Sequence, residues 1–317
     1  MKHALITGAT GFIGSNLVRV LNKRGIEVTI FRRPSSKLDN LKGCQYHDFI
    51  GSLANQADIE RAMEDCDAVF HLAGDGSFTS RDKALRVEAN IDSARTIVYC
   101  MEKKSGRRLV HCSSVAAVGL STSPEVILDE TSEFNAADLH YFYTKRKGEE
   151  IALDAAKRGL DVVVVNPATV LGPHGLRDVQ LKAFKKVAQG KMKVYPPGGN
   201  CFTSVYDVID GMLFAFEKGK SGERYILGGH NLTYKEYLGK IAACTGKKPP
   251  WIRLPGFVMP LSGGLMEMLF GSMGRDAGKL VSRFGFYSSQ KAERELGYKF
   301  TPIDKIIKSM LLLLDKE

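Results

Sequence analysis

A glycine-rich run, TGATGFIG, begins at the seventh residue and constrains the fold more than any other feature of this chain. Apolar residues 4–6 precede it and predict a short strand, and the spacing of Leu17, Val18 and Leu21 after it is typical of an amphipathic helix. Glycines at a turn from strand to helix let backbone N–H groups and the positive end of the helix dipole face a phosphate. The run therefore predicts a binding loop for the pyrophosphate of a dinucleotide.

Each glycine of this loop has its own expected role. Gly8 allows the tight turn, Gly11 lets the backbone approach the pyrophosphate, and Gly14 lets the helix pack closely on the strand. Three glycines at this spacing also occur in loops that bind nothing, so the flanking strand and helix carry the prediction. The cofactor residues predicted in this loop are Thr7, Gly8, Thr10, Gly11, Phe12, Ile13 and Gly14.

Strand-like and helical segments alternate along the first half of the chain. Strands are predicted at residues 28–31, 68–72, 109–112 and 161–166, with helical stretches between them. This alternation predicts an α/β fold with a doubly wound parallel sheet. We expect a dinucleotide-binding domain over residues 1–167 and a mainly substrate-binding lobe over residues 168–317. A strand near residues 224–227 is expected to return to the first domain, and Thr233 and Glu236 form a predicted capping box.

Composition narrows the classes of partner and compartment. A net charge of +10 favours anionic ligands such as phosphorylated cofactors, and the basic residues lack the interleaved aromatics of a single-strand nucleic-acid binder. The six cysteines are scattered, with no CxxC pair and no histidine spacing suited to zinc, so we expect a reduced cytoplasmic protein without a metal site. No signal-peptide pattern precedes the first strand, and Pro260 and Glu267 interrupt the apolar stretch 257–273, so no membrane span is expected.

A tyrosine and a lysine four residues apart, Tyr141 and Lys145, make the first catalytic candidate. In a helix this spacing places both side chains on one face. A neighbouring cation stabilises a phenolate, which helps a tyrosine to act as an acid or a base near neutral pH. Exposed helices often carry such a pair without any function, so the prediction depends on the residues that accompany it.

Two serines, Ser113 and Ser114, follow the predicted strand 109–112 and accompany that pair. Ligands of open α/β sheets bind at the carboxyl ends of the strands, where these serines are expected. A hydroxyl there can hydrogen-bond a substrate oxygen and orient it against Tyr141, although two serines can also merely cap the next turn. We predict Ser114 as catalytic and Ser113 as its structural neighbour.

Together with segment 70–74 (FHLAG), Asn90 and the Asn166–Pro167 dipeptide, these motifs resemble the extended short-chain dehydrogenase/reductase family, also called the NAD-dependent epimerase/dehydratase superfamily. The resemblance runs nearly end to end and implies a Rossmann fold. Segments 222–229 (GERYILGG) and 291–298 (KAERELGY) are most similar to the dihydroflavonol-4-reductase-like branch, which includes hopanoid-associated sugar epimerase-like proteins.

The resemblance implies roles for the matching residues. In that family the tyrosine exchanges a proton with substrate during hydride transfer, the lysine also binds the nicotinamide ribose, and the serine polarises the substrate oxygen; these roles fall on Tyr141, Lys145 and Ser114. Asp48 matches the acidic residue that meets the adenine amino group, although HDF replaces the usual GDL there. The other implied cofactor residues are Leu72, Ala73, Gly74, Asn90, Asn166 and Pro167.

Two arginines at the end of the second predicted strand indicate which dinucleotide is bound. Arg32 stands where an NAD-specific site usually has a carboxylate for the ribose 2′-hydroxyl, and Arg33 aligns with an arginine of NADP-using relatives. Guanidinium groups pair with a 2′-phosphate, so NADP is predicted in preference to NAD.

Two later features bear on the substrate. Nucleotide-sugar epimerases commonly carry an arginine that grips the substrate diphosphate, and Asn200 stands at that position here. The late stretch from Phe257 to Met273 is rich in adaptable apolar side chains, which line a pocket, a core or a dimer face. The apolar side chains in question are Phe257, Val258, Met259, Leu261, Leu265, Met266, Met268, Leu269, Phe270 and Met273.

Three functions remain as hypotheses from the sequence. The first is an NAD(P)-dependent oxidoreductase that interconverts a carbonyl and an alcohol on a medium-sized small-molecule substrate, with an apolar substrate as one option. The second is a nucleotide-sugar epimerase or dehydratase with a tightly bound dinucleotide. The third is a non-catalytic dinucleotide sensor, which has no need of Ser114, Tyr141 and Lys145 together. No nucleic-acid partner is expected, and a homodimer is left open.

Overall fold

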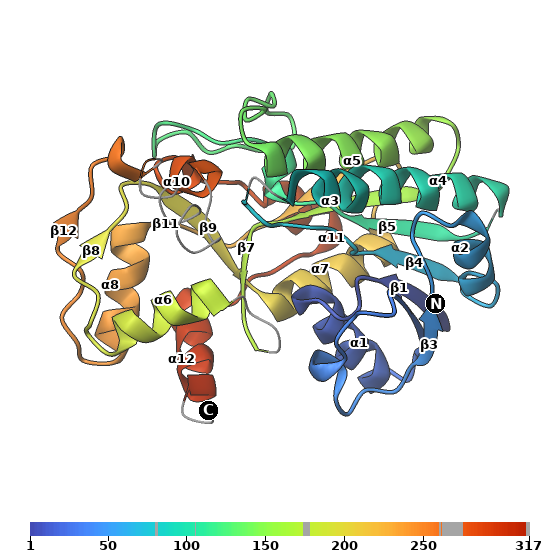
Figure 1. Ribbon diagram of the computed structural model, residues 1–317, viewed down its shortest axis with the longest axis horizontal. Helices are drawn as coiled ribbons and strands as arrows, with labels where there is room; N and C mark the ends of the chain where they lie inside the picture. Colours follow the sequence, from blue (N-terminus) through green and yellow to red (C-terminus); the bar gives the residue numbers. More distant parts are fainter. Residues whose placement is uncertain (80–81, 105, 174–177, 260, 262–274, 315–317) are drawn as a thin grey trace.

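A parallel sheet forms the centre of the larger unit in the computed structural model, which describes residues 1–79, 82–104, 106–173, 178–259, 261 and 275–314 (Figure 1). Among these residues, seven strands pair in the order β10-β6-β5-β4-β1-β2-β3, and every pairing is parallel. The strands are β1 (His3–Thr7), β2 (Glu27–Arg32), β3 (His47–Ile50), β4 (Ala68–His71), β5 (Arg108–Cys112), β6 (Val162–Pro167) and β10 (Arg224–Leu227).

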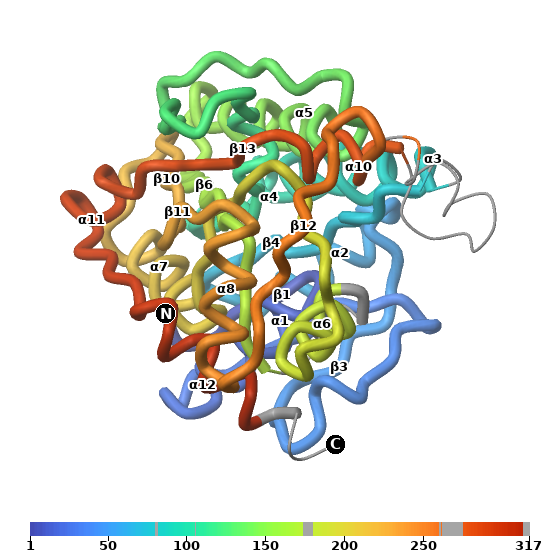
Figure 2. The backbone as a smooth tube through the Cα atoms, turned by 90° about the vertical axis from the view of Figure 1, so that its left-hand side faces the viewer, coloured from blue at the N-terminus to red at the C-terminus, as the bar shows by residue number. Residues whose placement is uncertain are grey.

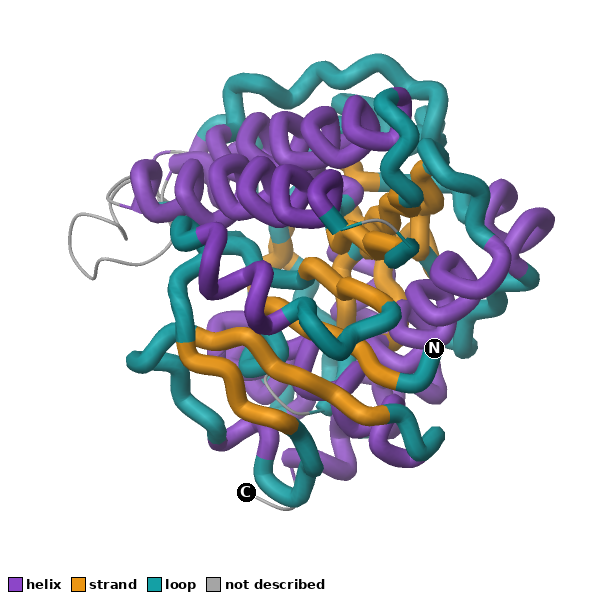
Figure 3. The backbone as a smooth tube through the Cα atoms, turned by 90° about the vertical axis from the view of Figure 1, so that its right-hand side faces the viewer, coloured by secondary structure: helices purple, strands orange, loops and turns teal. Residues whose placement is uncertain are grey.

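Helices cover both faces of this sheet because side chains along each strand alternate between the faces. In β1, Ala4 and Ile6 pack with α1 and α7, whereas Leu5 packs with α2, α4 and α5 on the other face. Figure 3 shows the strands between the two helical layers. The helices of this unit are α1 (Phe12–Lys23), α2 (Gln56–Ala62), α3 (Lys83–Val87), α4 (Ser93–Lys103), α5 (His140–Lys157), α7 (Val205–Lys218) and α11 (Gln290–Leu296), with short 3-10 turns at Asp39–Leu41 and Val115–Ala117 and a π-helical turn at Glu88–Asp92.

The strand order reverses between β1 and β4, and this reversal determines where a ligand can bind. Crossovers from the two halves of the sheet leave in opposite directions there and open a crevice at the carboxyl ends of the strands. The glycine-rich loop follows β1 at this edge, residues 72–74 follow β4, and the two serines follow β5. All the loops predicted to bind the cofactor or the substrate carbonyl therefore start from one edge of the sheet.

A smaller unit packs beside the sheet and has its own core (Figure 2). Its central strand β9 pairs with β7, β11 and β13, and Phe202 of β9 stacks on Tyr237 with ring centroids 4.0 Å apart. Ile306, Ile307 and Met310 of α12 complete this core. The elements are β7 (Thr169–Leu171), α6 (Asp178–Ala188), β8 (Val194–Tyr195), β9 (Gly199–Ser204), β11 (His230–Thr233), α8 (Tyr234–Cys244), β12 (Ile252–Arg253), α10 (Arg275–Val281), β13 (Phe284–Gly285) and α12 (Ile303–Leu314).

The chain crosses between the two units more than once. After β9, helix α7 packs on the sheet against α1, and β10 pairs in parallel with β6, so residues beyond 167 complete the larger unit. The division at residue 167 stays a prediction. The predicted capping box is present, with Thr233 and Glu236 bonded reciprocally at the start of α8. In the part of the chain that is described, no helix is both long and apolar enough to cross a membrane.

Candidate active site

The glycine-rich loop has the geometry expected of a pyrophosphate cradle. Gly8 has φ +71°, and a Cβ added to it would lie 2.6 Å from the backbone nitrogen of Ala73. A Cβ on Gly14 would lie 2.3 Å from the carbonyl oxygen of Gly8, so α1 packs against the loop more closely than any other residue permits. Helix α1 begins after Gly11 with no side-chain cap, which leaves the N–H groups of its first turn for an anion.

The first threonine of the glycine-rich run, Thr7, supports the loop from within the protein. Thr7 is fully buried, and its Oγ1 lies 2.7 Å from His71 Nδ1 and accepts a 3.2 Å hydrogen bond from the Ala73 N–H. Leu72 donates its N–H to the carbonyl oxygen of Thr7 over 3.1 Å. These bonds join the loops after β1 and β4 into one surface. Thr10 is fixed from outside by Asn40, which donates to its carbonyl oxygen over 3.0 Å.

The two arginines predicted to bind a 2′-phosphate differ in their surroundings. The Arg32 guanidinium makes a two-pronged ion pair with Asp48, with N–O distances of 2.7 and 2.6 Å. This arrangement brings together the residue predicted at the 2′-phosphate and the residue predicted at adenine. Arg33 follows with an exposed side chain. Sequence reasoning treated Arg32 and Asp48 separately and missed their pairing, because their side chains meet only once β3 pairs with β2.

Lys145 lies at the carboxyl end of β5, where its ammonium donates a 2.9 Å hydrogen bond to the carbonyl oxygen of Cys112. Asn90 lies nearby: a Cβ added to Gly74 would be 2.8 Å from Asn90 Oδ1 and 3.7 Å from Lys145 Nζ. The Asn90 amide also donates to Thr144 Oγ1 over 3.0 Å. The structure therefore brings together Gly74, Asn90 and Lys145, which the sequence analysis predicted in the cofactor site.

The backbone around Asn90 departs from a regular helix. Residues Glu88–Asp92 form a π-helical turn between α3 and α4, and such turns are frequent at functional sites. A Cβ on Gly148 of α5 would lie 2.1 Å from the Asn90 carbonyl oxygen. The close approach of α5 to this turn therefore requires glycine at position 148, a residue that the sequence reasoning did not single out.

Ser114 caps the short turn Val115–Ala117 that packs against α5. Its Oγ accepts a 3.1 Å hydrogen bond from the Ala116 N–H, which leaves the hydroxyl proton to be donated to a ligand. Ser113 is buried, and its Oγ has no hydrogen-bond partner among the described residues. Ser114 can therefore cap the turn and contact a substrate at the same time, which are the two roles considered for the serines from the sequence.

A buried polar network holds the backbone of Ser114, and most of it was missed from the sequence. Asn166 donates to the Ser114 carbonyl oxygen over 3.0 Å and also to the fully buried carboxylate of Glu149. That carboxylate pairs with Arg224 of β10 at 2.7 Å. Pro167 ends β6 directly after Asn166. In this structure Asn166 therefore holds the backbone of Ser114 in place at the carboxyl edge of the sheet.

Two buried histidines lie beneath Lys145. The rings of His71 and His111 are 5.4 Å apart, and both are almost fully buried. Burial lowers the pKa of His71 to about 3 and lowers the pKa of His111 well below its usual value, and the Lys145 ammonium adds to both shifts. His71 and His111 are therefore neutral at pH 7, and the charge of Lys145 lowers the pKa of both.

The ring of Tyr141 lies in an apolar setting. It meets Phe78 edge to face at 5.3 Å and Phe142 at 5.9 Å, and Leu280 of α10 packs on the same cluster. Asp138, near the start of α5, binds Arg283 through two hydrogen bonds of 3.0 and 2.9 Å, which holds the α10 segment over this region. The smaller unit thus contributes to the wall beside Tyr141.

The late apolar stretch is only partly described. Phe257 and Leu261 are 76% and 67% exposed, and Val258 and Met259 are half-buried. Leu265, Met266, Met268, Leu269, Phe270 and Met273 lie outside the described residues. Asn200 lies in β9, and its Oδ1 accepts from the backbone N–H of Cys201 over 3.0 Å.

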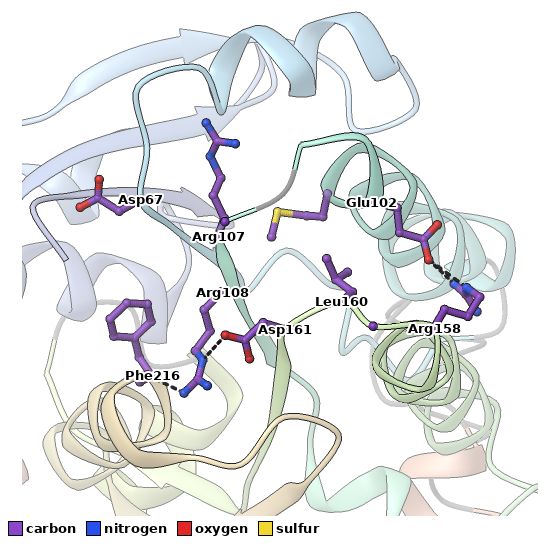
Figure 4. Close-up of a pocket in the computed structure, with 11 residues that line it drawn as sticks. Asp67, Glu102, Arg107, Arg108, Arg158, Leu160, Asp161 and Phe216 are labelled. Atoms are coloured by element: carbon purple, nitrogen blue, oxygen red, sulfur yellow. Dashed lines mark hydrogen bonds and ion pairs between the residues drawn. The ribbon is translucent and has the colours of Figure 1, made fainter.

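A cavity of about 710 Å³ at the opposite edge of the sheet differs in character from this site (Figure 4). It lies at the amino ends of β4, β5 and β6, and its arginines are already bonded within the protein. Arg108 binds Asp161 at 2.9 Å and Arg158 binds Glu102 at 2.7 Å. None of the residues predicted for catalysis or cofactor binding lines this cavity.

Curated proteins resemble this chain over most of its length. A putative dihydroflavonol 4-reductase from Synechocystis sp. is 32% identical over 92% of this chain and 88% of its own length. Sterol demethylase protein B from Methylococcus capsulatus is 33% identical over 80% of this chain and 78% of its own length.

Solved structures share the whole fold. The crystal structure of gox2253 covers 100% of this chain and 98% of its own, with a TM-score of 0.85 and 29% identity. A UDP-glucuronic acid 4-epimerase from Bacillus cereus, solved with UDP-glucuronic acid and NAD, covers 99% of both chains with a TM-score of 0.80, and its 20% identity supports the fold alone.

The family model for the NAD dependent epimerase/dehydratase family matches residues 4–228. This match and the two curated relatives confirm the family and the Rossmann fold that the sequence predicted. The chain belongs to the NAD dependent epimerase/dehydratase family and is an NAD(P)-dependent enzyme of the extended short-chain dehydrogenase/reductase type.

Proposed function

We propose that this enzyme uses NADP to interconvert the carbonyl and the alcohol of an apolar small molecule. The observation that carries the proposal is the apolar cluster of Phe78, Phe142 and Leu280 around the ring of Tyr141. A substrate oxygen bound at Tyr141 would have hydrocarbon beside it rather than charged groups. The Synechocystis and Methylococcus relatives have names that refer to a dihydroflavonol and a sterol, both of which are ring systems with large apolar surfaces.

The chain offers a complete set of groups for the dinucleotide. The uncapped first turn of α1 and the backbone of Gly11 suit the pyrophosphate, and the Lys145 ammonium suits the nicotinamide ribose. When bound, the dinucleotide supplies or accepts the hydride. Arg33, and Arg32 when it turns from Asp48, supply guanidinium groups for a 2′-phosphate, which supports NADP over NAD.

The protein residues divide the remaining chemistry among them. Tyr141 donates its hydroxyl proton to the substrate oxygen as the carbonyl carbon is reduced, and it accepts that proton in the reverse direction. Lys145 stabilises the phenolate left behind. Ser114 donates its hydroxyl proton in a hydrogen bond to the same oxygen and orients the carbonyl against Tyr141.

A substrate panel tests this proposal. Aldehydes and ketones of increasing chain length are incubated with NADPH, and NADPH absorbance is followed. Each buried methylene contributes about 0.8 kcal/mol, so KM is expected to fall stepwise with length. UDP- and dTDP-sugars are expected to give neither turnover nor tight binding. Micromolar binding of a UDP-sugar with conversion to its epimer would contradict the proposal.

Epimerisation or dehydration of a nucleotide sugar is the second candidate, because the family includes such enzymes. Enzymes of that kind transfer hydride twice and retain their dinucleotide. Purified protein that carries one nicotinamide dinucleotide per chain and consumes no external NADPH would favour it. The neutral Asn200, whose oxygen already accepts from the backbone, supports the first candidate instead.

Cofactor choice has its own test. Replacement of Arg32 by Asp together with Arg33 by Asn removes both guanidinium groups and supplies an acceptor for the ribose hydroxyls, so preference is expected to shift from NADP towards NAD. Tighter binding of NAD than of NADP by the unmodified protein in calorimetry would contradict the NADP assignment. A cytoplasmic location remains part of the proposal, and a homodimer remains open.

A further inference from the structure

Three metal-binding side chains converge at the amino edge of the sheet, away from the catalytic residues. His3, Glu27 and His47 are the first residues of β1, β2 and β3. One ligand atom from each lies within 4.8 Å of those of the other two. No other group of three His, Cys, Asp or Glu side chains in the described ranges comes together in this way. We propose that His3, Glu27 and His47 bind a divalent transition metal of the zinc class.

Strand pairing explains why these side chains meet. His3 pairs with Glu27 in the β1–β2 register, and Thr29 pairs with His47 in the β2–β3 register. Register partners in a parallel sheet project from the same face, and so do residues two apart on one strand. All three ligands therefore project from one face of adjacent strands. Their distance along the chain is the reason that histidine spacing in the sequence gave no sign of a metal site.

The ring of His3 is already oriented for a metal ion. Its Nε2 lies 2.8 Å from the hydroxyl of Thr29, and its Nδ1 lies 3.9 Å from Glu27 Oε2. A metal-bound histidine characteristically donates its second ring N–H to an oxygen, which fixes the tautomer and the ring plane. Bonds to zinc of about 2.0–2.2 Å in a tetrahedral site place two ligand atoms about 3.3–3.6 Å apart. Ligand atoms that lie within 4.8 Å of one another therefore need to approach by only about 1 Å to hold one ion.

The surroundings suit a zinc-class ion. The three side chains line a cavity of about 410 Å³ together with Arg61 and Asp65. Arg61 is paired with Asp58 at 2.8 Å, so its charge is largely neutralised there. Two imidazoles and one carboxylate match the preferences of zinc, whereas calcium and magnesium prefer oxygen ligands alone. The cavity leaves room for a further coordination position.

Binding would join three strands at the edge of the sheet. β3 is the last strand of the sheet on this side and spans only His47–Ile50. An ion held by β1, β2 and β3 would cross-link this edge, and the ligands come together only in the folded protein. Zinc is therefore expected to raise the thermal unfolding midpoint in proportion to the logarithm of its free concentration above Kd.

Calorimetric titration with ZnCl₂ tests the site, using full-length protein stripped with a chelator and with its accessible thiols alkylated. The unmodified protein is expected to bind one ion at this site. His3→Gln and His47→Gln should each weaken binding by about tenfold or more, and Thr29→Val, which removes the oxygen that holds His3, by about tenfold. His230→Gln, a matched histidine in β11, should leave binding unchanged.

The outcomes separate clearly. Circular dichroism of each variant without zinc shows whether it is folded. If a histidine variant fails to fold, Thr29→Val still tests the site, because it nearly preserves the volume of a buried side chain. Equal affinity in the unmodified protein, His3→Gln and His47→Gln would overturn the proposal, as would the absence of zinc binding in the unmodified protein. Loss confined to these variants and Thr29→Val would support it.

Discussion

The two edges of the seven-stranded sheet use their polar side chains in opposite ways. Near the amino ends of β5 and β6, Arg108 donates to three backbone carbonyl oxygens and to Asp161, and Arg158 binds Glu102. At the carboxyl edge, within the described residues, Lys145 donates one of its three N–H groups to the Cys112 carbonyl oxygen, and the Ser114 hydroxyl keeps its proton to donate. The difference shows that charge alone does not identify a binding site. We expect the binding site where hydrogen-bond donors such as those of Lys145 and Ser114 are left unused by the protein.

The largest expected effect comes from the carboxyl edge. Tyr141→Phe keeps the ring in its apolar cluster and removes the proton donor, so kcat is expected to fall by about a hundredfold to ten-thousandfold. Steady-state kinetics with NADPH and the best carbonyl of the panel measure it. Tyr143→Phe, an exposed tyrosine two residues further along α5, is the matched control and should retain full activity. Turnover of Tyr141→Phe within a few-fold of the parent would end the assignment.

Stability should respond to pH through the buried histidines of the carboxyl edge. The pKa of His71 is lowered to about 3, so His71 stays neutral in the folded protein while the unfolded chain takes up a proton below about pH 6.5. The stabilisation is complete above pH 6.5 and is lost as pH falls towards 3. At pH 5 this amounts to about 2 kcal/mol for His71 alone, at about 1.4 kcal/mol per pH unit. His111 acts in the same direction.

Urea unfolding at pH 7 and pH 5 measures this loss. Carboxylates with lowered pKa values, such as Asp58 and Asp138, lose their stabilisation only below the pKa of an unfolded carboxyl group. Burial raises the pKa values of Glu130 and Asp210, and these groups favour the folded state as pH falls, so a loss of stability between pH 6.5 and 5 reports on the histidines. His111→Leu should reduce the pH dependence, since it removes one of the two buried histidines and leaves His71. The Nδ1 of His111 has no partner in the described structure, so the substitution breaks no hydrogen bond at that atom. An unchanged slope in that variant would show that other groups carry the effect.

The same two edges explain what could be predicted from the sequence. The glycine-rich loop and the strands β1, β2, β4, β5, β6 and β10 follow from patterns within a few residues. The predictions of Ser114, Tyr141 and Lys145 rest on patterns of the same short range. Strand β3 has largely exposed side chains, and β8, β12 and β13 span two residues each, too short for an alternating pattern. These elements could not be recognised before the fold was known.

Contacts between distant strands were equally hidden. The pairing of Arg32 with Asp48, and the network from Ser114 through Asn166 and Glu149, depend on which strands are neighbours in the sheet. The sequence shows which side chains are polar, but the register of strand pairing determines which of them come into contact. The same limit applies to His3, Glu27 and His47 at the amino edge. The sequence analysis expected no metal site because the spacing of the histidines along the chain did not suit zinc.

A smaller effect is expected at the adenosine end of the carboxyl edge. Arg33→Gln removes an exposed guanidinium, and NADP is expected to bind about tenfold more weakly, which corresponds to about 1.4 kcal/mol. NAD lacks the 2′-phosphate, so its Kd in the same variant is the internal control and should not change. Calorimetry with both dinucleotides gives the two values. Equal weakening of both would mean that Arg33 supports the loop rather than the phosphate.

The smallest effect belongs to the amino edge and tests the other side of the comparison. Arg158 and Glu102 are 54% and 35% exposed, and their closest N–O distance is 2.7 Å. An exposed ion pair contributes between about 0 and 1 kcal/mol, so Arg158→Gln should change the free energy of unfolding in urea by less than about 1 kcal/mol. Because its charge is neutralised within the protein, kcat and KM for NADPH and the carbonyl substrate should stay at the parent values. A fall in NADPH affinity in this variant would show that the paired arginines of the amino edge attract the anionic cofactor after all, and that pairing within the protein does not exclude a role in binding.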